Sequence, residues 1–130
     1  MKPYDLFFLI PAAAVFFIWQ NNDIVITKHN YINKKLPDSF KGFKILHISD
    51  FHNKNFHGRL VKKMEEISPD IIVITGDLID RRRTNLNLTE EFIKKAAKIA
   101  PTYYVSGNHE QLSERYTELK EILNKYSVIN

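Results

Sequence analysis

Three short polar strings, each placed directly after an apolar run, constrain most strongly how this chain can fold. The strings are Asp50-Phe51-His52, Gly76-Asp77-Leu78-Ile79-Asp80 and Gly107-Asn108-His109-Glu110, and the runs before them are residues 43–49, 71–75 and 102–106. The apolar runs read as buried strands, and in an open α/β sheet ligands bind outside the carboxyl ends of the strands. The sequence therefore predicts a polar site at one edge of a sheet.

The segments between the runs predict helices, so the chain should alternate strand and helix. Residues 59–68 carry apolar side chains at helical spacing, and residues 114–126 do the same, whereas Asn87-Leu88-Thr89-Glu90 resembles a capping box that opens a helix to Ala100. Residues 24–32 read as a further strand, residues 34–42 as a turn, and residues 127–129 as the start of another strand. Successive strand–helix units imply right-handed crossovers and a parallel sheet.

Composition limits the size and chemistry of the domain. The chain has 130 residues, 44% of them hydrophobic and 26% charged, which is typical of one small folded domain. The absence of cysteine excludes disulfides and thiolate metal sites. A formal charge of +4 suits a phosphate-carrying partner or an anionic membrane surface without requiring either.

The N-terminus differs in kind from the rest of the chain. Residues 6–19 contain no charged or strongly polar side chain, and Tyr4 and Trp19 would lie at the two membrane interfaces. We expect residues 1–22 to be a single-pass membrane anchor and linker, although a spanning helix needs about 20 apolar residues. A cleaved signal peptide and a soluble helix are the alternatives. The flanking lysines favour a cytoplasmic position for residues 23–130 without settling the side of the membrane.

The residue types in the three strings suit divalent metal ions. In an extended stretch Asp50 and His52 point to the same side, so that a carboxylate and an imidazole can share one cation. Asp77 can bridge two cations, and Asn108 offers a neutral oxygen to the second. A cation pair about 3.5–4 Å apart clamps the attacking and leaving oxygens of an in-line displacement and lowers the pKa of a bound water. His109 is better placed to donate a proton to the leaving oxygen, and Glu110 could orient its ring.

In this order, the patterns Asp-x-His, Gly-Asp-x-x-Asp and Gly-Asn-His-Glu resemble the calcineurin-like metallophosphoesterases. The sequence is similar to their membrane-anchored bacterial branch in its N-terminal apolar segment, in Leu36-Pro37, and in the stretch from His47 to His52. The resemblance implies a two-sheet sandwich flanked by helices, of which this chain would hold the first half. It also implies that Asp50, His52 and Asp77 bind one metal, that Asp77 and Asn108 bind a second, and that His109 is the catalytic acid.

By the same resemblance, the function is metal-dependent hydrolysis of a phosphoester, phosphodiester or pyrophosphate bond by a hydroxide that two metal ions activate. The metals would be Mn, Fe, Zn or Mg, and the substrate would be lipid-linked or a nucleotide. No nucleic-acid partner is expected. The family completes both metal shells with histidines from its second half, and this chain has none after His109. We therefore interpret it as the N-terminal part of such an enzyme, with a missing C-terminal half or a dimer partner. The alternatives are an inactive or weakly metal-binding tethered remnant and one half of a split enzyme.

Four further positions have ordinary structural interpretations beside their functional ones. Asp80 is either a turn residue or a support for the metal ligands, and Glu110 is either a surface residue or a support. His47 is expected to be packed within its strand or to support the ligands. Arg81, followed by Arg82 and Arg83, is either in a solvated loop or in contact with a substrate phosphate or a lipid headgroup.

Overall fold

The computed structural model describes Pro11 and residues 23–130, in two units divided after residue 33. In the first unit, residues 23–33 form neither helix nor strand, so the strand predicted for residues 24–32 is wrong. Val25 and Ile32 are 80% and 92% exposed, and a strand without a hydrogen-bonded neighbour is not stable on its own. No helix among the described residues is long and apolar enough to cross a membrane, and the predicted anchor at residues 1–22 lies outside them except for Pro11.

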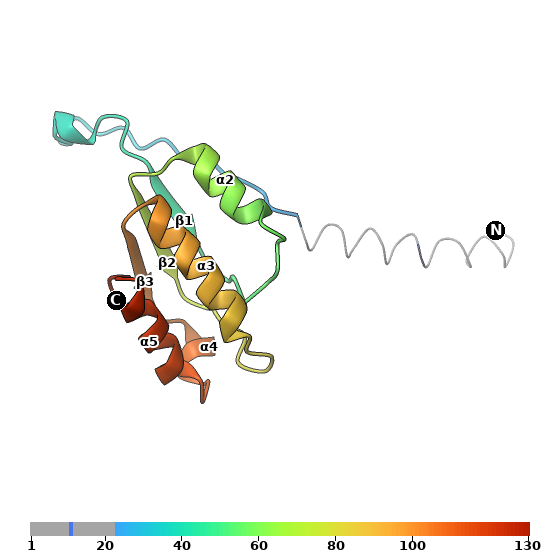
Figure 1. Cartoon of the computed structure of the whole chain (residues 1–130). Coiled ribbons are helices and arrows are strands. Elements are labelled where there is room, and N and C mark those ends of the chain that lie inside the picture. The colour runs from blue at the N-terminus through green and yellow to red at the C-terminus, as the bar shows by residue number, and fades with distance from the viewer. Residues whose placement is uncertain (1–10, 12–22) are drawn as a thin grey trace, which may run out of the picture. The chain divides into compact units, whose positions relative to one another are not determined.

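The second unit, residues 34–130, alternates strand and helix as predicted (Figure 1). Its elements in chain order are η1 (Asp38–Phe40), β1 (Ile45–Ile48), α2 (Arg59–Ile67), β2 (Ile71–Thr75), α3 (Leu86–Ile99), β3 (Thr102–Val105), α4 (Asn108–Gln111) and α5 (Tyr116–Lys125). Within these residues, β1, β2 and β3 form a three-stranded sheet in that order, with every pair parallel. The predicted α/β class and parallel sheet are therefore confirmed.

Local sequence explains where the helices begin and end. Asn85 caps α3 by accepting a hydrogen bond from the backbone N–H of Leu88, at 3.2 Å. The capping box predicted at Asn87 is therefore two residues too late, because the earlier asparagine already serves the free N–H groups. Pro69 and Pro101 follow the ends of α2 and α3 closely, as expected of a residue that cannot continue a helix. The four-residue helix α4 was not predicted from the sequence.

The helices α2, α3 and α5 cover one face of the sheet (Figure 1). Alternate strand residues face them and are buried, among them Ile72, Ile74 and Tyr104. The core is completed from the helices and loops by a set of fully or nearly buried side chains: Phe51, Met64, Leu78, Ile79, Leu86, Phe92, Ile93, Ala96, Ala100, Leu119, Leu123 and Val128.

The opposite face of the sheet is apolar and exposed. Ile45 on β1 and Val105 on β3 are 62% and 57% exposed, and Tyr103 lies in register with the half-buried Val73. Ile129 extends this face through a single parallel bridge to Tyr103. This bridge agrees with the prediction that residues 127–129 begin a further strand. We call Ile45, Val73, Tyr103, Val105 and Ile129 the open face.

Candidate metal centre

The three polar strings meet at one edge of the sheet because the strands before them are parallel. Asp50 follows β1, Asp77 follows β2, and Gly107 precedes α4 after β3. Backbone hydrogen bonds continue past the strands and join the first two strings, from His52 N to the Asp77 carbonyl (2.8 Å) and from Asp50 N to the Gly76 carbonyl (3.3 Å). Backbone hydrogen bonds therefore connect the first two strings beyond the strands, and the strings lie together at one edge of the sheet as predicted.

The side chains of Asp50, His52 and Asp77 form a compact group of possible metal ligands. One ligand atom from each residue lies within 4.8 Å of the others. His52 Nε2 is 3.7 Å from Asp50 Oδ1, which is longer than a hydrogen bond. His52 Nδ1 is buried and has no hydrogen-bond partner among the described residues. Two carboxylates and an imidazole that are close without bonding to one another fit a shared divalent cation.

The backbone of this ligand group is strained. Asp50, His52 and Asp77 have φ values of 55°, 48° and 51°, in the left-handed region that side chains disfavour. Each such residue costs about 1–3 kcal/mol, and residues of this kind cluster at functional sites. The strain shows that the loops hold the three side chains where relaxed strand ends would not place them.

Two glycines allow the second and third strings to approach each other closely. A Cβ atom on Gly107 would lie 2.7 Å from the Asp77 backbone N and would collide with the Asp77 carboxylate. A Cβ on Gly76 would lie 2.7 Å from the Gly107 Cα. Both positions therefore require glycine for steric reasons, and the contact sets the position of Asp77 against the start of α4.

Glu110 links the same two strings through hydrogen bonds to their backbones. It is fully buried, and its Oε2 accepts hydrogen bonds from the backbone N–H groups of Asp77 (2.8 Å) and Gly107 (2.7 Å). Its Oε1 accepts one from Ile79 N, at 2.9 Å. Glu110 is therefore buried and not a surface residue, and among the described residues its carboxylate bonds to backbone N–H groups and not to the His109 ring. Its role as a support for metal ligands stays a prediction.

The His109 ring lies between the metal-ligand group and the loop after Asp77. Its backbone N–H donates to Asp77 Oδ1 (3.0 Å), and its Nδ1 accepts from the backbone N–H of Arg81 (3.2 Å). The ring packs edge-on against His52, with centroids 4.4 Å apart. Asn108 precedes it as the exposed first residue of α4.

A second group of possible ligands, not anticipated from the sequence, consists of His52, Asp80 and His109. Asp80 Oδ1 also accepts hydrogen bonds from the backbone N–H groups of Arg82 (2.7 Å) and Arg83 (3.2 Å). These bonds, first of all the one from Arg82, hold the pKa of the Asp80 carboxyl below its usual range, and nearby imidazoles act in the same direction. Asp80 is thus both a turn residue and a neighbour of the site.

His47 differs from its expected packing, and Asn53 has a role that the sequence did not indicate. His47 is exposed rather than packed, and its Nε2 is 2.5 Å from Thr75 Oγ1 on the side of the sheet away from the helices. Asn53, which the sequence did not single out, contacts three backbone positions of the loop after Asp80. Its only sequence signal is its place directly after Asp50-Phe51-His52.

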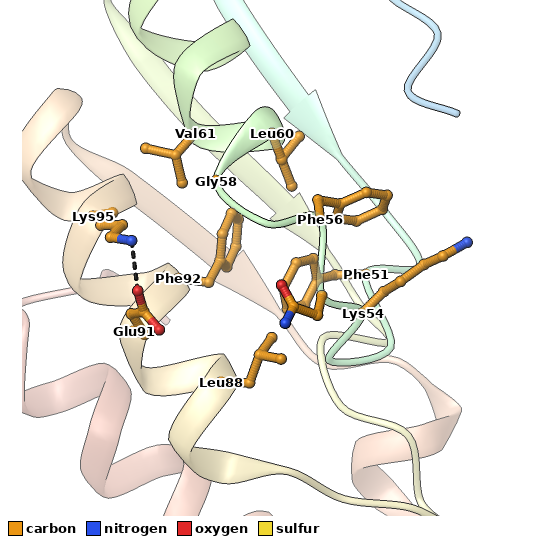
Figure 2. Close-up of a pocket in the computed structure, with 11 residues that line it drawn as sticks. Phe51, Lys54, Phe56, Gly58, Leu60, Val61, Leu88, Glu91, Phe92 and Lys95 are labelled. Carbon is orange, nitrogen blue, oxygen red and sulfur yellow. Dashed lines mark hydrogen bonds and ion pairs between the residues drawn. The ribbon is translucent and has the colours of Figure 1, made fainter. Parts of the chain in front are cut away.

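A small pocket lies between α2, α3 and the loop that follows β1, and Phe51 is part of its lining (Figure 2). Phe51, the residue between Asp50 and His52, stacks on Phe92 of α3 with centroids 4.3 Å apart, and it also contacts Phe56. The cavity volume is about 60 Å³, far below the roughly 300–1,000 Å³ of ligand pockets. The pocket is therefore too small for a ligand of ordinary size, and the packing of Phe51 against Phe92 and Phe56 anchors the loop that carries Asp50 and His52.

Comparisons with known proteins agree on one family. The sequence profile described as calcineurin-like phosphoesterase matches residues 43–130. An uncharacterized metallophosphoesterase of Campylobacter jejuni is 27% identical over 94% of this chain and 36% of its own length. A UDP-2,3-diacylglucosamine pyrophosphatase of Chlamydia trachomatis is 24% identical over 94% of the chain and 40% of its own.

A transmembrane protein with a metallophosphoesterase domain from Bos taurus is 33% identical over 58% of the chain and 18% of its own length. The chain thus spans well under half the length of the curated relatives that it matches.

Proposed function

We propose that this chain, which belongs to the calcineurin-like phosphoesterase family, provides half of a two-metal phosphohydrolase site. The observation that carries the proposal is the strained ligand group at the sheet edge. Asp50, His52 and Asp77 converge there within 4.8 Å without hydrogen bonding to one another. The reaction would be hydrolysis of a phosphoester, phosphodiester or pyrophosphate bond.

The proposed metal ligands come from the three polar strings at the sheet edge. Asp50, His52 and Asp77 would hold one divalent cation, and Asp77 with Asn108 would hold a second. The His52–Asp50 pair, whose atoms are close but not hydrogen bonded, fits the first of these cations. When bound, such ions polarise phosphoryl oxygens and lower the pKa of bound water. Hard oxygens with one imidazole suit Mn, Fe, Zn or Mg.

His109 would act as the acid for the leaving oxygen. A backbone N–H can only donate, so the Arg81 N–H requires an unprotonated Nδ1 on His109. Nδ1 is thus engaged by the backbone, and Nε2 is the ring nitrogen that would exchange a proton with the leaving oxygen. The ring contact between His109 and His52 supports a position beside the proposed metal ligands.

The names of the relatives and the apolar N-terminus support a proposal for the substrate class and for the location of the chain. A chlamydial relative is named as a pyrophosphatase of a diacylated sugar nucleotide, and vertebrate relatives are named as transmembrane proteins. We propose a lipid-linked or nucleotide substrate for this chain, and a membrane anchor at residues 1–22.

The open face supports the proposal that further protein completes the domain. Apolar sheet faces of this kind are normally covered, because leaving them in water forfeits the hydrophobic free energy of burial. We propose that a C-terminal half or a dimer partner covers Ile45, Val105 and their neighbours and supplies further metal ligands.

Manganese-dependent hydrolysis of bis-p-nitrophenyl phosphate by the full chain tests the function. Because the remaining metal ligands would come from other protein, we expect slow turnover that requires Mn²⁺ and disappears with Asp77→Asn, while the exposed control Asp38→Asn retains it. Equal turnover by Asp77→Asn would refute the assignment. Mn²⁺ binding without turnover would favour the tethered metal-binding remnant over the enzyme.

A further inference from the structure

A short turn with exposed aromatic side chains precedes β1. It consists of residues 34–44, which include η1, and we call it the aromatic turn. Leu36, Phe40 and Phe43 are 42%, 51% and 39% exposed, and the two phenylalanine rings pack together with centroids 5.5 Å apart. Aromatic side chains normally bury their large apolar area, so a cluster of exposed ones indicates a contact surface.

Hydrogen bonds hold the backbone of the aromatic turn in one conformation. The N–H of Phe40 donates to the Pro37 carbonyl (3.0 Å), and the N–H of Phe43 donates to the Phe40 carbonyl (3.1 Å). The N–H of Lys44 donates to Asp70 Oδ2 at 2.6 Å, which joins the turn to the segment after α2. The two rings are therefore already held in place, which lowers the entropy cost of inserting them into another surface.

Lysines are interleaved with the apolar residues of the aromatic turn. Four of its residues are exposed lysines: Lys34, Lys35, Lys41 and Lys44. Asp38 is the only acidic residue among residues 34–44. Aromatic rings suit the headgroup level of a bilayer, and neighbouring lysines are attracted to anionic lipids. The five residues of the open face include no lysine, so the charge of the turn favours a lipid surface where the open face favours protein.

The place of the aromatic turn in the chain also suits a membrane contact. It follows the proposed anchor, residues 1–22, after residues 23–33, which can span at most about 40 Å. Val25, Tyr31 and Ile32 in this stretch are 80%, 76% and 92% exposed, and Lys28 stands between them. A turn tethered within that distance meets the bilayer at a high effective concentration, so even a weak contact would be populated.

We propose that the aromatic turn lies in the interface of an anionic lipid bilayer, with its aromatic rings among the headgroups and its lysines on lipid phosphates. The turn precedes β1, whereas the metal-ligand group follows β1 and β2, so the two lie at opposite ends of the parallel strands (Figure 1). A bilayer at the turn therefore leaves the metal-ligand group on the side away from the lipid. Of the two substrate classes proposed above, this favours the nucleotide. The membrane contact stands independently of the reaction, whereas the substrate preference rests on the proposed function.

Tryptophan fluorescence of the full chain in lipid vesicles tests the contact. Trp19→Phe removes the one natural tryptophan, and Phe40→Trp then places a reporter in the aromatic turn. In vesicles of equimolar phosphatidylcholine and phosphatidylglycerol we expect a blue-shifted emission, which falls about twofold or more when the lipid acyl chains are brominated. Phe43→Trp should behave in the same way. Absence of quenching at both positions would overturn the proposal.

Leu112→Trp is the matched control for position. Leu112 is 63% exposed and directly follows α4, at the end of the sheet that carries the metal-ligand group. In the same Trp19→Phe background, brominated lipid should leave its emission unchanged. Equal quenching at positions 40 and 112 would overturn the proposal, because the bilayer would then contact both ends of the sheet.

A further pair of variants tests the contribution of charge. The first removes three lysines of the turn by replacement with glutamine: Lys34, Lys35 and Lys41. The control removes the same charge from exposed positions elsewhere: Lys94, Lys98 and Lys120. In the Phe40→Trp chain, the first variant should reduce the quenching about threefold or more, and the control should retain it. Equal losses would overturn the proposal in favour of a general attraction by net charge.

Two other outcomes separate this contact from a different occupant and from the metal site. A blue shift of the Phe40→Trp emission that grows with chain concentration in the absence of vesicles would overturn the proposal in favour of a second copy of the chain. Quenching in a chain that binds no Mn²⁺ would support the membrane contact while rejecting the proposed metal function.

Discussion

Replacement of Glu110 by glutamine should destabilise the chain far more than the same replacement of an exposed glutamate. The carboxylate accepts three backbone hydrogen bonds, from Asp77, Gly107 and Ile79. A glutamine oxygen in the place of Oε2 keeps the first two, whereas its NH₂ group would face the buried Ile79 N–H. The lost bond costs about 1–3 kcal/mol, and the other two lose the charge that makes such bonds roughly twice as strong.

Together these effects predict a loss of about 3 kcal/mol in the free energy of unfolding for Glu110→Gln. That is a large share of the roughly 5–15 kcal/mol that stabilise a typical domain, so Glu110→Ala should not fold at all. Urea denaturation followed by circular dichroism measures the effect. With a slope near 1.5 kcal/mol per M, the midpoint should fall by about 2 M.

Glu114→Gln is the matched control, because Glu114 is exposed and lies on the neighbouring loop. It should change the free energy of unfolding by less than about 0.5 kcal/mol. A Glu110→Gln variant as stable as this control would refute the argument that one buried carboxylate holds the second and third ligand strings together.

The remaining predictions concern the glycine contact, a buried tyrosine and the open face. Gly107→Ala should weaken Mn²⁺ binding, measured by calorimetry, and lower the free energy of unfolding by more than about 2 kcal/mol, measured by urea denaturation. Gly42→Ala is the control, because a Cβ there meets no atom within 4 Å. It should lower the free energy of unfolding by only about 1 kcal/mol, the cost of the left-handed backbone conformation. Burial, with the nearby Glu110 charge, raises the pKa of Tyr104 above its usual range, so its stabilisation is complete below pH 10 and is lost as the pH rises further. Above pH 10, wild type should lose about 1.4 kcal/mol per pH unit more than Tyr104→Phe, and equal slopes would contradict this. If the wild-type chain self-associates through the open face, the double variant Ile45→Thr, Val105→Thr should sediment more slowly than wild type in sedimentation velocity. The same sedimentation coefficient for the variant and an associating wild type would show that the contact lies elsewhere.

The sheet and its order follow from the sequence because their causes are local. Continuous apolar runs such as Ile71–Thr75, separated by helical patterns, leave few topologies besides a parallel sheet. The meeting of Asp50, His52 and Asp77 at one edge is then a consequence of that topology.

The elements that were misjudged depend on partners that a single sequence does not reveal. Residues 24–32 alternate like a strand, but they form no ladder among the described residues. The start of α3 depends on which asparagine caps it. Asn85 and Asn87 are the same residue type and equally suited to an N-cap, and in the structure Asn85 accepts the hydrogen bond from Leu88 N.

The supporting residues of the site were the least predictable part. Glu110 and Asn53 act through backbone N–H and carbonyl groups of loops 25 or more positions away in the chain. Such bonds depend on the exact path of the loops. Glu110 stands in the third string and was expected to orient His109, so only its backbone partners could not be predicted, whereas Asn53 has no distinguishing residue pattern. His47 was expected either to be packed within its strand or to support the ligands, and it is not packed, because it lies on the exposed side of the sheet.

Calorimetric titration of the chain with Mn²⁺ tests the central claim most directly. We predict two sites, the tighter one formed by Asp50, His52 and Asp77, and the loss of both in Asp77→Asn because this carboxylate would serve each cation. Asp38→Asn should bind as wild type does. Absence of binding by the wild-type chain, or equal binding by Asp77→Asn, would contradict a metal site at these residues.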